Sequence, residues 1–576
     1  MPDTRTLPIA AKHREFIVKA DGQEVPREYQ LVSVDISVAV NSIGKARLVY
    51  VDGTAASSSF PLSDSALFKP GQRIEILADS GDEQESLFDG LVVRHSVRVS
   101  ERTSPQLIVE CRHAAMKLAV TRRSANYFEC SDSDIIDELL SAAGVDADIE
   151  STTVTHKQVV QYLSTDWDFL LARARANGKL VWCEGDTLIV RAPSFDAEPV
   201  CTLLYGATLL EFAAEIDARL QVDSLHSLSW DSAQQELIDV EGAAPDLAAP
   251  GNLSSSELAD VAGCRLDLCH VALCEAEAQA WADGIGVYRR LNQISGYAKC
   301  IGIGNVRPGT VIELSGVGER FNGKIFVSAV RHEYGAAQGW KTHIQFGGVP
   351  LESAASAPAP AAGGLLAPAS GLHIGIVTSN EDPDGEYRVR IRLPLLGDDD
   401  GVWARVASVD AGDDRGFFIR PEIGDEVVIG FLDTDPRHPV ILGMLHSSAK
   451  AAPLQGSDDN HQKLYKSRSG MRLHFDDEKK IMTLDTPSGN ALILNEDEES
   501  LTLMDQNGNK IALSADGIVL ESAKALTIKA STELSLESGT ALTAEGGTEL
   551  ALKGATQVEL SCDAITKIAG SMVYIN

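Results

Sequence analysis

The sequence is poor in features that would each point to one class of protein. Nine cysteines in 576 residues are too few, and odd in number, for a disulfide-stapled scaffold. No apolar run reaches the roughly 18 residues that a membrane-spanning helix needs. Residues 1–16 lack the apolar core of a secretory signal. We therefore expect a protein made in a reducing cytosol without a signal peptide and without stable membrane insertion.

Cationic residues are also scarce. Lys and Arg total 50 against 83 Asp and Glu, so the net charge is −33. Nucleic acids and anionic membranes are recognised by cationic groups, so this balance argues against both as main partners. The 48 glycines and 22 prolines follow no three-residue period, which excludes collagen. At about 150 residues per domain, the length predicts about four domains.

Strand-like segments dominate the first 350 residues. Residues 8–125 contain alternating apolar runs separated by Asp-Gly and Pro-Gly turns, which predict a barrel-like domain. Ser131 and Asp134 have the spacing of a capping box, so a helix is expected to begin there and to end at Gly144. Thr165 and Asp168 predict the start of a second helix in the same way.

In the middle of the chain, segments predicted to be loops or linkers alternate with segments predicted to form helices and strands. Residues 236–262 are polar and rich in Ala, Ser and Pro, and predict a loop, whereas a helix is expected from Glu275. Residues 352–370 consist of small residues and Pro with almost nothing to bury, which predicts a linker. Residues 371–446 hold short strands between turns, as a five-stranded barrel of the OB type would.

The C-terminal tail carries a strict repeat. Its apolar residues fall at positions 518, 526, 534, 542, 550 and 558, each usually followed by a second apolar residue two places on. Residues two apart point to one face of a strand, and a fixed period marks a repetitive β architecture. The predicted core residues are Ile518, Leu520, Leu526, Ile528, Leu534, Leu536, Leu542, Leu550, Leu552, Val558 and Leu560.

Each such segment has only one narrow apolar face, so its edges must be covered. Parallel segments wound about a central apolar axis would do this. One chain could supply three octads per coil, or three chains could each supply one side of a triangular prism. The period alone leaves both open. A flat antiparallel meander is the plainer alternative, but its spacing normally drifts as turns vary.

Motifs that could carry chemistry are weak. Gly318, Gly323 and Lys324 match the first part of a Walker A loop, but Ile325 replaces the magnesium-binding Ser or Thr, and the text predicts a strand, a turn and a strand. His332 begins a zincin-like motif that lacks its second histidine.

Cysteine and charge clusters are no more specific. Cys264, Cys269, His270 and Cys274 have irregular spacing for a zinc site, so small buried side chains are the favoured interpretation. Arg388, Arg390 and Arg392 alternate with apolar residues but lack neighbouring aromatic platforms, which favours a solvated strand face. The acidic runs 476–478 and 496–499 lack the spacing of a calcium loop and predict solvated turns. No catalytic residue, metal site or cofactor is therefore expected.

Residues 375–406 and 416–445 closely resemble the OB domain of the VgrG family of contractile-injection spike proteins and their phage counterparts. The residues that carry this likeness are Asp382-Pro383, Arg388-Val389, Leu393-Pro394, Trp403-Ala404-Arg405, Pro421-Glu422, Gly424-Asp425-Glu426-Val427, Asp435-Pro436, Pro439-Val440 and Gly443. Residues 159–178, 203–212 and 321–334 resemble the hub of the same proteins, and the octads resemble their needle. The segment at 165–178 is closer to spikes of extracellular contractile particles, of the antifeeding-prophage kind, than to the common type VI class.

The resemblance implies a mainly β fold: a tube-like β-barrel hub with a few helices, an OB-fold barrel and a C-terminal intertwined triangular β-helix. The expected parts are a hub over 1–351, a linker over 352–370, an OB domain over 371–448, a neck over 449–470 and a needle over 471–576. The hub is expected to hold two related barrels per chain. The implied partners are two further copies of the chain, a PAAR-repeat tip protein, hexameric inner-tube proteins, baseplate proteins and effector cargo. Tip binding would fall to Val573, Tyr574, Ile575 and Asn576.

The implied function is that of a non-enzymatic central spike, placed between the baseplate and inner tube and a PAAR-type tip, which pierces a target envelope when a sheath contracts. Such a particle leaves the bacterial cytoplasm for the extracellular space or a target cell. The alternative is a type VI secretion spike that carries effectors between bacteria. A cell-wall hydrolase and a trimeric glycan-binding tail fibre are remoter alternatives.

Overall fold

The computed structural model describes residues 15–79, 84–231, 236–243, 245, 247, 250–270, 273–336, 338–350, 361–394 and 401–575. The chain forms two compact units, Met1–His446 and Ser447–Asn576. Strands outnumber helices throughout the described residues, so the predicted mainly β fold with a few helices is confirmed. The helices are α1 (Asp132–Ala143), α2 (Asp166–Ala176), α3 (Ser255–Ala262) and α4 (Glu275–Leu291), with 3-10 turns η1 (Ala114–Ala119), η2 (Ala218–Leu220), η3 (Ala361–Gly364) and η4 (Leu432–Thr434).

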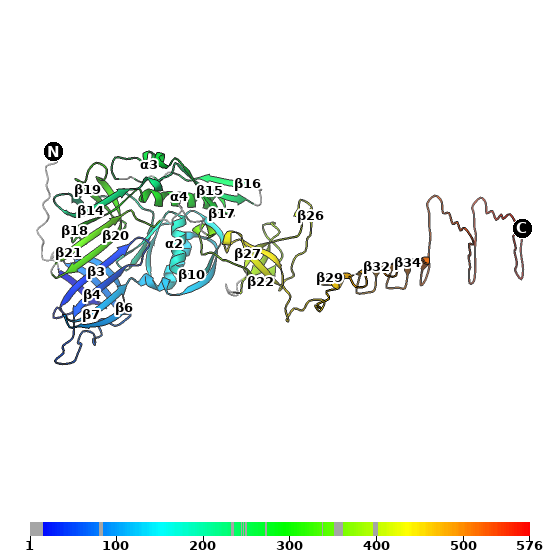
Figure 1. Ribbon diagram of the computed structural model, residues 1–576, viewed down its shortest axis with the longest axis horizontal. Coiled ribbons are helices and arrows are strands. Elements are labelled where there is room, and N and C mark those ends of the chain that lie inside the picture. Colours follow the sequence, from blue (N-terminus) through cyan, green and yellow to red (C-terminus); the bar gives the residue numbers. More distant parts are fainter. Residues whose placement is uncertain are drawn as a thin grey trace. The chain divides into compact units, whose positions relative to one another are not determined.

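One large sheet forms the frame of the hub, the part of the first unit that precedes residue 351 (Figure 1). Strands from both ends of the hub meet where β20 pairs with β3, so its two halves are continuous rather than two separate closed barrels. The thirteen strands are β1 (Glu15–Ala20), β2 (Gln23–Glu24), β3 (Leu31–Ala39), β4 (Lys45–Val51), β5 (Arg73–Asp79), β6 (Gln84–Ser100), β7 (Thr103–Arg112), β13 (Thr202–Leu204), β14 (Leu209–Ile216), β18 (Ile294–Ile301), β19 (Val311–Ser315), β20 (Gly323–Gly335) and β21 (Gly339–Phe346).

Each half of this sheet has its own apolar core. Alternating residues of β3, β4, β5 and β7, such as Ile36, Leu48 and Val109, are fully buried in the first core. Ile312 and Val327, among others, fill the second. Because strand residues two apart share a face, the alternation seen in the sequence is sufficient to build both cores.

Helices and three small sheets cover the hub between these halves. The predicted helix starts are confirmed: the Ser131 hydroxyl accepts from the Asp134 amide, and the Asp134 carboxylate accepts from the Ser131 amide. Gly144 ends α1 in the left-handed region, which glycine adopts without a steric cost. The small sheets consist of β8 (Arg122–Ser131) with β10 (Thr155–Thr165), of β9 (Asp146–Ile149) with β11 (Leu180–Glu184) and β12 (Thr187–Arg191), and of β15 (Ser224–Asp231) with β16 (Glu236–Glu241) and β17 (Arg265–His270).

The loop predicted over 236–262 is wrong. It contains strand β16 and helix α3. Ile238 and Val240 of β16 alternate inward and pack toward α4. Ser254 and Glu257 form a capping box at the start of α3. Both signals were present in the sequence but were hidden by the surrounding small and polar residues.

Residues 371–446 form the predicted five-stranded closed barrel. Its interior is a separate core that includes Val389, Ile391 and Val427, and hub residues Val160 and Tyr162 join this core. The barrel strands are β22 (His373–Ser379), β23 (Val389–Arg392), β24 (Val402–Val406), β27 (Glu426–Phe431) and β28 (Pro439–Met444), with a small hairpin of β25 (Ala411–Gly412) and β26 (Arg415–Gly416).

The second half of the predicted linker is not an unburied connection. Residues 351–360 lie outside the described residues, but Leu365 and Leu366 are buried in hub cores. Ala369 is buried in the core of the barrel. Three apolar side chains in a stretch of alanine and glycine are therefore enough to fasten the connection to both parts.

The second unit begins as an antiparallel meander of seven strands. This part of the predicted needle differs from the expected parallel winding and follows the plainer meander alternative. Its strands start nine or ten residues apart except for the last, which starts seven residues after the one before it. The strands are β29 (Gln462–Lys466), β30 (Arg472–Asp476), β31 (Ile481–Asp485), β32 (Ala491–Asn495), β33 (Ser500–Met504), β34 (Lys510–Ser514) and β35 (Gly517–Glu521).

Candidate functional site

The eight-residue period is visible in the backbone of residues 522–575, which we call the apolar repeat. Bends fall at 523–524, 531–532, 539–540, 547–548, 555–556, 563–564 and 571–572. Six residues run between consecutive bends, and in four of the six segments, from 525–530 to 557–562 with 541–546 left out, the large apolar residues are the second and fourth. Two residues apart on an extended chain share a face, so each segment presents its large apolar side chains on one side.

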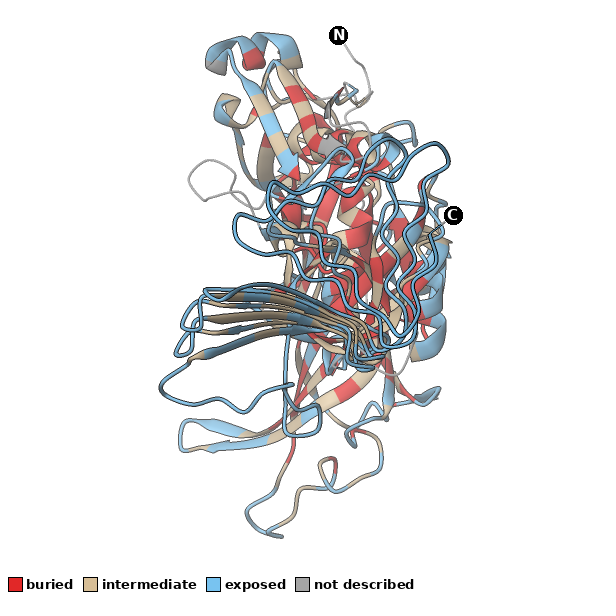
Figure 2. Ribbon diagram, turned by 90° about the vertical axis from the view of Figure 1, so that its right-hand side faces the viewer, coloured by how far each residue is buried: buried red, intermediate tan, exposed pale blue. Residues whose placement is uncertain are grey.

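This apolar face is uncovered in the single chain. Residues 523–575 are all exposed (Figure 2). All eleven residues predicted to form the core are more than half exposed, from 53% for Val558 to 70% for Ile518 and Leu560. Ile518 and Leu520 lie on β35, the edge strand of the meander, and the other nine lie in the apolar repeat.

The backbone of the apolar repeat is equally unsatisfied. No strand pairing involves residues 522–575 in the part of the chain that the structure describes. Extended backbone normally pairs its amides and carbonyls with a neighbouring strand. A segment with neither ladder partners nor a covered apolar face is incomplete as a single chain.

The predicted tip residues are exposed as well. Tyr574 and Ile575 are among the most exposed apolar side chains of the second unit, and Val573 is about half exposed. Asn576 lies outside the described residues. Among the described residues, no contact joins these tip residues to the other features of the structure considered below.

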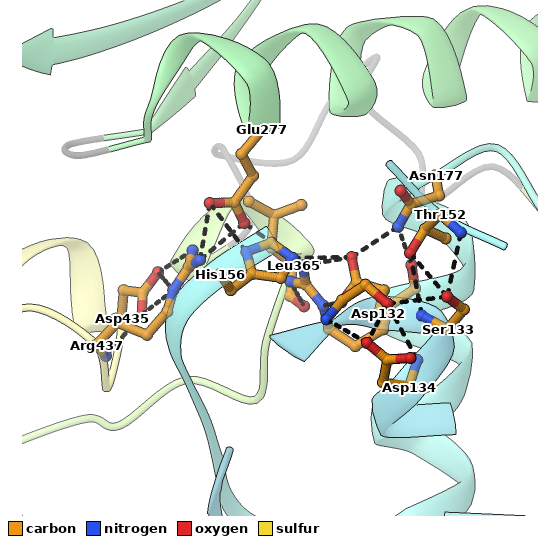
Figure 3. A network of polar contacts seen from close by, with 12 residues as sticks. Asp132, Ser133, Asp134, Thr152, His156, Asn177, Glu277, Leu365, Asp435 and Arg437 are labelled. Carbon is orange, nitrogen blue, oxygen red and sulfur yellow. Dashed lines mark hydrogen bonds and ion pairs between the residues drawn. The ribbon is translucent and has the colours of Figure 1, made fainter. Parts of the chain in front are cut away.

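A second feature is a chain of buried charges that links the hub to the barrel (Figure 3). Arg173 of α2 is fully buried and donates from Nε to the Asp132 carboxylate at 2.6 Å. Its Nη2 lies 3.5 Å from the Glu277 carboxylate at the start of α4. Glu277 accepts in turn from Arg437 of the barrel at 2.7 Å. We call Asp132, His156, Arg173, Glu277, Asp435 and Arg437 the ionic junction.

Burial disfavours the charged form of the carboxylates in this junction, but their pairing with arginines outweighs the effect of burial. Burial raises the pKa of Asp132, but the charge of Arg173 and hydrogen bonds from His156 and Arg173 bring that pKa below its ordinary value. Burial also raises the pKa of Glu277, and the charges of Arg437 and Arg173 overcome that effect. Asp132 and Glu277 also lie in the first turns of their helices, where the macrodipole favours negative charge.

Asp435 completes the chain on the barrel side. Its carboxylate is fully buried and accepts from Nη2 of Arg437 at 2.9 Å. Burial raises its pKa, yet the charge of Arg437 and a hydrogen bond from His270 hold that pKa well below its usual range. The junction thus fixes hub and barrel by paired charges from segments up to about 300 residues apart in sequence. Motif analysis missed it because no local spacing brings these residues together.

Comparisons with known proteins agree with this architecture. Residues 10–335, more than half of the chain, match the family described as the Alg8 N-terminal domain. Residues 373–446 match the Type VI secretion system/phage-baseplate injector OB domain. The spike protein VgrG5 of Pseudomonas aeruginosa is 32% identical over 91 residues. The chain belongs to the Alg8 N-terminal domain family, and its OB domain is similar to that of VgrG-type spike proteins.

The matched stretch spans only about a tenth of the length of the curated relatives. It covers 15% of this chain and 12% of VgrG5, and a match to VgrG1a of the same species, 36% identical over 67 residues, covers 12% and 10%. The fold likeness is broader. The half-lidded Francisella PdpA-VgrG complex contains a chain with a TM-score of 0.53 at 8% identity, over 88% of each chain. The lidded form gives 0.53 at 10% identity, over 90% of this chain and 81% of that one.

Each of the weaker sequence motifs lies at a place in the fold where a structural role explains its residues. Gly318 lies in the loop after β19, and Gly323 and Lys324 begin β20, which pairs antiparallel with β19, so the Walker-like glycines are followed by a strand and not by a helix. His332 is buried against Thr342 and Trp340, and burial lowers its pKa to about 3. The acidic runs lie at the turns after β30 and β32, as predicted.

Two sequence interpretations need correction. Cys264, Cys269 and Cys274 are exposed rather than buried, because they flank or lie on the outer side of the edge strand β17. The arginine stripe is not simply solvated: Arg388 binds the Asp382 carboxylate at 2.8 Å, and its guanidinium lies over the ring of Trp403. None of the helices among the described residues is long and apolar enough to span a membrane.

Proposed function

We propose that three copies of this spike assemble through residues 518–575 into a triangular parallel β-helix, the needle of a contractile injection system. The observation that carries the proposal is the apolar repeat: a strict eight-residue period whose leucines are exposed and whose backbone has no strand partner within the described chain. Three parallel copies would pair each strand edge and bury each apolar face.

The structure favours three chains over one chain that winds about itself. In a self-wound coil, octads three segments apart would pair with each other and bury their leucines within the single chain. The apolar repeat instead stays open along its whole described length. A further copy of the same chain has the same eight-residue period, so its segments can pair with those of the apolar repeat along the whole length.

The remaining parts have roles that follow from this assembly. Each hub contributes two half-sheets with separate cores, so three hubs present six, which suits a hexameric inner tube above them. The OB barrel serves as a collar between hub and needle. The proposed parts are the hub over 1–351, the linker over 352–370, the OB domain over 371–448, the neck over 449–470 and the needle over 471–576.

The exposed end formed by Val573, Tyr574 and Ile575, with Asn576, is the proposed seat of a PAAR-repeat tip. Driven by sheath contraction, the needle would pierce a target envelope and leave the producing cell with its cargo. We assign the chain to the extracellular contractile particles, because residues 165–178 resemble the corresponding segment of their spikes. The type VI alternative is favoured by the names of the curated relatives. Isolation of the chain in sheathed particles from culture supernatant would support the first class, and its release only on cell contact would support the second.

A cysteine in the apolar repeat allows a direct test. Cys562 is exposed and lies two residues beyond Leu560, just before a bend. In a parallel trimer in register, three copies of this thiol lie at one level of the prism. With the other exposed cysteines, Cys264, Cys269 and Cys274, replaced by serine, a bis-maleimide should therefore link the chain into covalent dimers, and the further change Cys562→Ser should remove that product. Equal cross-linking of the two proteins would refute the parallel register.

A further inference from the structure

Three potential metal ligands converge where the hub meets the barrel. His270 ends strand β17 of the hub, and Asp435 and His438 lie in the barrel segment between η4 and β28. Each offers one ligand atom, and these atoms lie within 4.8 Å of one another. Nε2 of His270 is 2.8 Å from Oδ2 of Asp435, and the two imidazole rings lie 6.0 Å apart between centroids.

The chemistry of this group differs from an ordinary salt bridge. The side chains of His270 and Asp435 are fully buried. Nε2 of His438 is also buried, and no atom of the described residues accepts from it or donates to it. Buried polar atoms nearly always have a partner. A proton on Nε2 of His270 would give the Asp435 carboxylate a hydrogen-bond donor, but it would leave Nε2 of His438 without a partner. A cation bound by all three residues would give each of them a partner.

The surroundings resemble the outer shell of a metal site. The Asp435 carboxylate is held by the Arg437 guanidinium and by the Arg437 amide, the latter at 2.8 Å. The His438 amide donates to the Asp435 carbonyl at 3.0 Å, which fixes both residues on one turn. Carboxylates that bind metals are themselves hydrogen-bonded in this way.

The charge balance points the same way. The ionic junction contains the carboxylates of Asp132, Glu277 and Asp435 but only the guanidiniums of Arg173 and Arg437. With neutral histidines, one negative charge in this buried chain is unmatched. A bound cation would supply the missing positive charge at its barrel end.

We propose that His270, Asp435 and His438 bind a divalent first-row transition-metal ion that fastens the OB barrel to the hub. Two imidazoles and one carboxylate form a donor set used for Zn²⁺ and for Fe²⁺. Ligand bonds of about 2.0–2.2 Å place donor atoms roughly 3–3.5 Å apart around one ion, which small side-chain movements here achieve. The sequence predicted no metal, because two of the three ligands lie about 165 residues from the first.

The site can be tested on the full-length chain without a histidine tag. The protein is stripped with EDTA, dialysed and titrated with Co²⁺, whose visible absorption strengthens when the ion leaves octahedral water for a site of lower coordination number. Zn²⁺ is then added as competitor. We expect saturation at one ion per chain and displacement by Zn²⁺. His270→Gln and His438→Gln should weaken binding at least tenfold. His446→Gln removes an exposed histidine of the same unit and should bind as the wild type does.

A second readout does not depend on the variants. All six tryptophans precede residue 447, so their fluorescence follows unfolding of the first unit alone. Zn²⁺ should raise the melting temperature of the stripped wild type and of His446→Gln, and should leave that of His438→Gln unchanged. The proposal is overturned if the stripped wild type shows no saturable Co²⁺ band, or if His438→Gln binds and responds as the wild type does. It stands independently of the trimer.

Discussion

Replacing the leucines of one octad should open the needle, and the structure sets the size of the effect. Leu534 and Leu536 are 55% and 68% exposed in the single chain. Full burial of a leucine contributes about 1.5–3 kcal/mol, so covering the surface that remains exposed contributes roughly 1–2 kcal/mol for each side chain. In the proposed trimer, two leucines from each of three chains would therefore contribute about 6–12 kcal/mol, before any cavity is counted. The double variant Leu534→Ala, Leu536→Ala should lose most of this.

Trypsin gives a local assay of that loss. Lys529 lies five residues before Leu534 within the apolar repeat. Cleavage of a transiently opened segment follows the population of the open state, and each 1.4 kcal/mol changes that population tenfold. We expect cleavage after Lys529, followed by mass spectrometry, to be roughly 10⁴-fold faster in the double variant.

The matched control changes the neighbouring outward positions instead. Ser535→Ala with Glu537→Ala alters the same octad but leaves the apolar face intact. Surface changes of this kind usually stay within about 0.5 kcal/mol, so the control should be cleaved within a few-fold of the wild-type rate. The reasoning is refuted if the control opens as readily as the leucine variant, or if Lys529 is already cleaved rapidly in the wild type.

Three further predictions concern the first unit and use tryptophan fluorescence. Arg437→Gln leaves buried carboxylates unpaired and should cost about 3–5 kcal/mol, whereas Arg415→Gln at an exposed pair should have no measurable effect; equal losses would contradict the ionic junction. Ser131→Ala removes the cap of α1 and should cost about 1 kcal/mol in urea unfolding, and an unchanged midpoint would count against the capping box. Carboxylates such as Asp132 have depressed pKa values, so their stabilisation is complete above their unfolded pKa of about 4 and is lost at lower pH. The melting temperature should therefore fall on acidification below about pH 4, and a rise there would contradict the assignment.

Local patterns were sufficient for much of this fold. The capping boxes, the alternation of apolar residues and the turn residues around the barrel each depend on neighbours within a few positions. They correctly gave α1, α2, α4 and the five-stranded barrel. The eight-residue period likewise appears as bends at every eighth residue of the apolar repeat.

The features that the sequence did not predict depend on residues far apart in the chain or on the structure that surrounds them. The ionic junction joins Asp132 to Arg437 through residues that no spacing connects. Leu365 and Leu366 lie among alanines and glycines, and only the hub around them explains their burial. The meander over 462–521 uses the same apolar alternation as the repeat that follows, and only the longer spacing of its strands separates the two.

The ionic junction and the proposed needle would be stabilised by different interactions. Hub and barrel are fastened by buried charges whose geometry tolerates little movement, since an unpaired charge in that position is costly. In the proposed trimer, the needle would depend on apolar faces that are exposed in the single chain and are buried only when copies come together. Rigidity in the first unit is a property of one chain, whereas rigidity in the second would be a property of the proposed assembly.

The mass of the purified full-length chain in dilute native buffer tests the central claim most directly. Light scattering or sedimentation equilibrium should give three times 61.6 kDa, or 184.8 kDa, without lowering on dilution. A folded particle of 61.6 kDa with the apolar repeat still attached would contradict the three-chain needle.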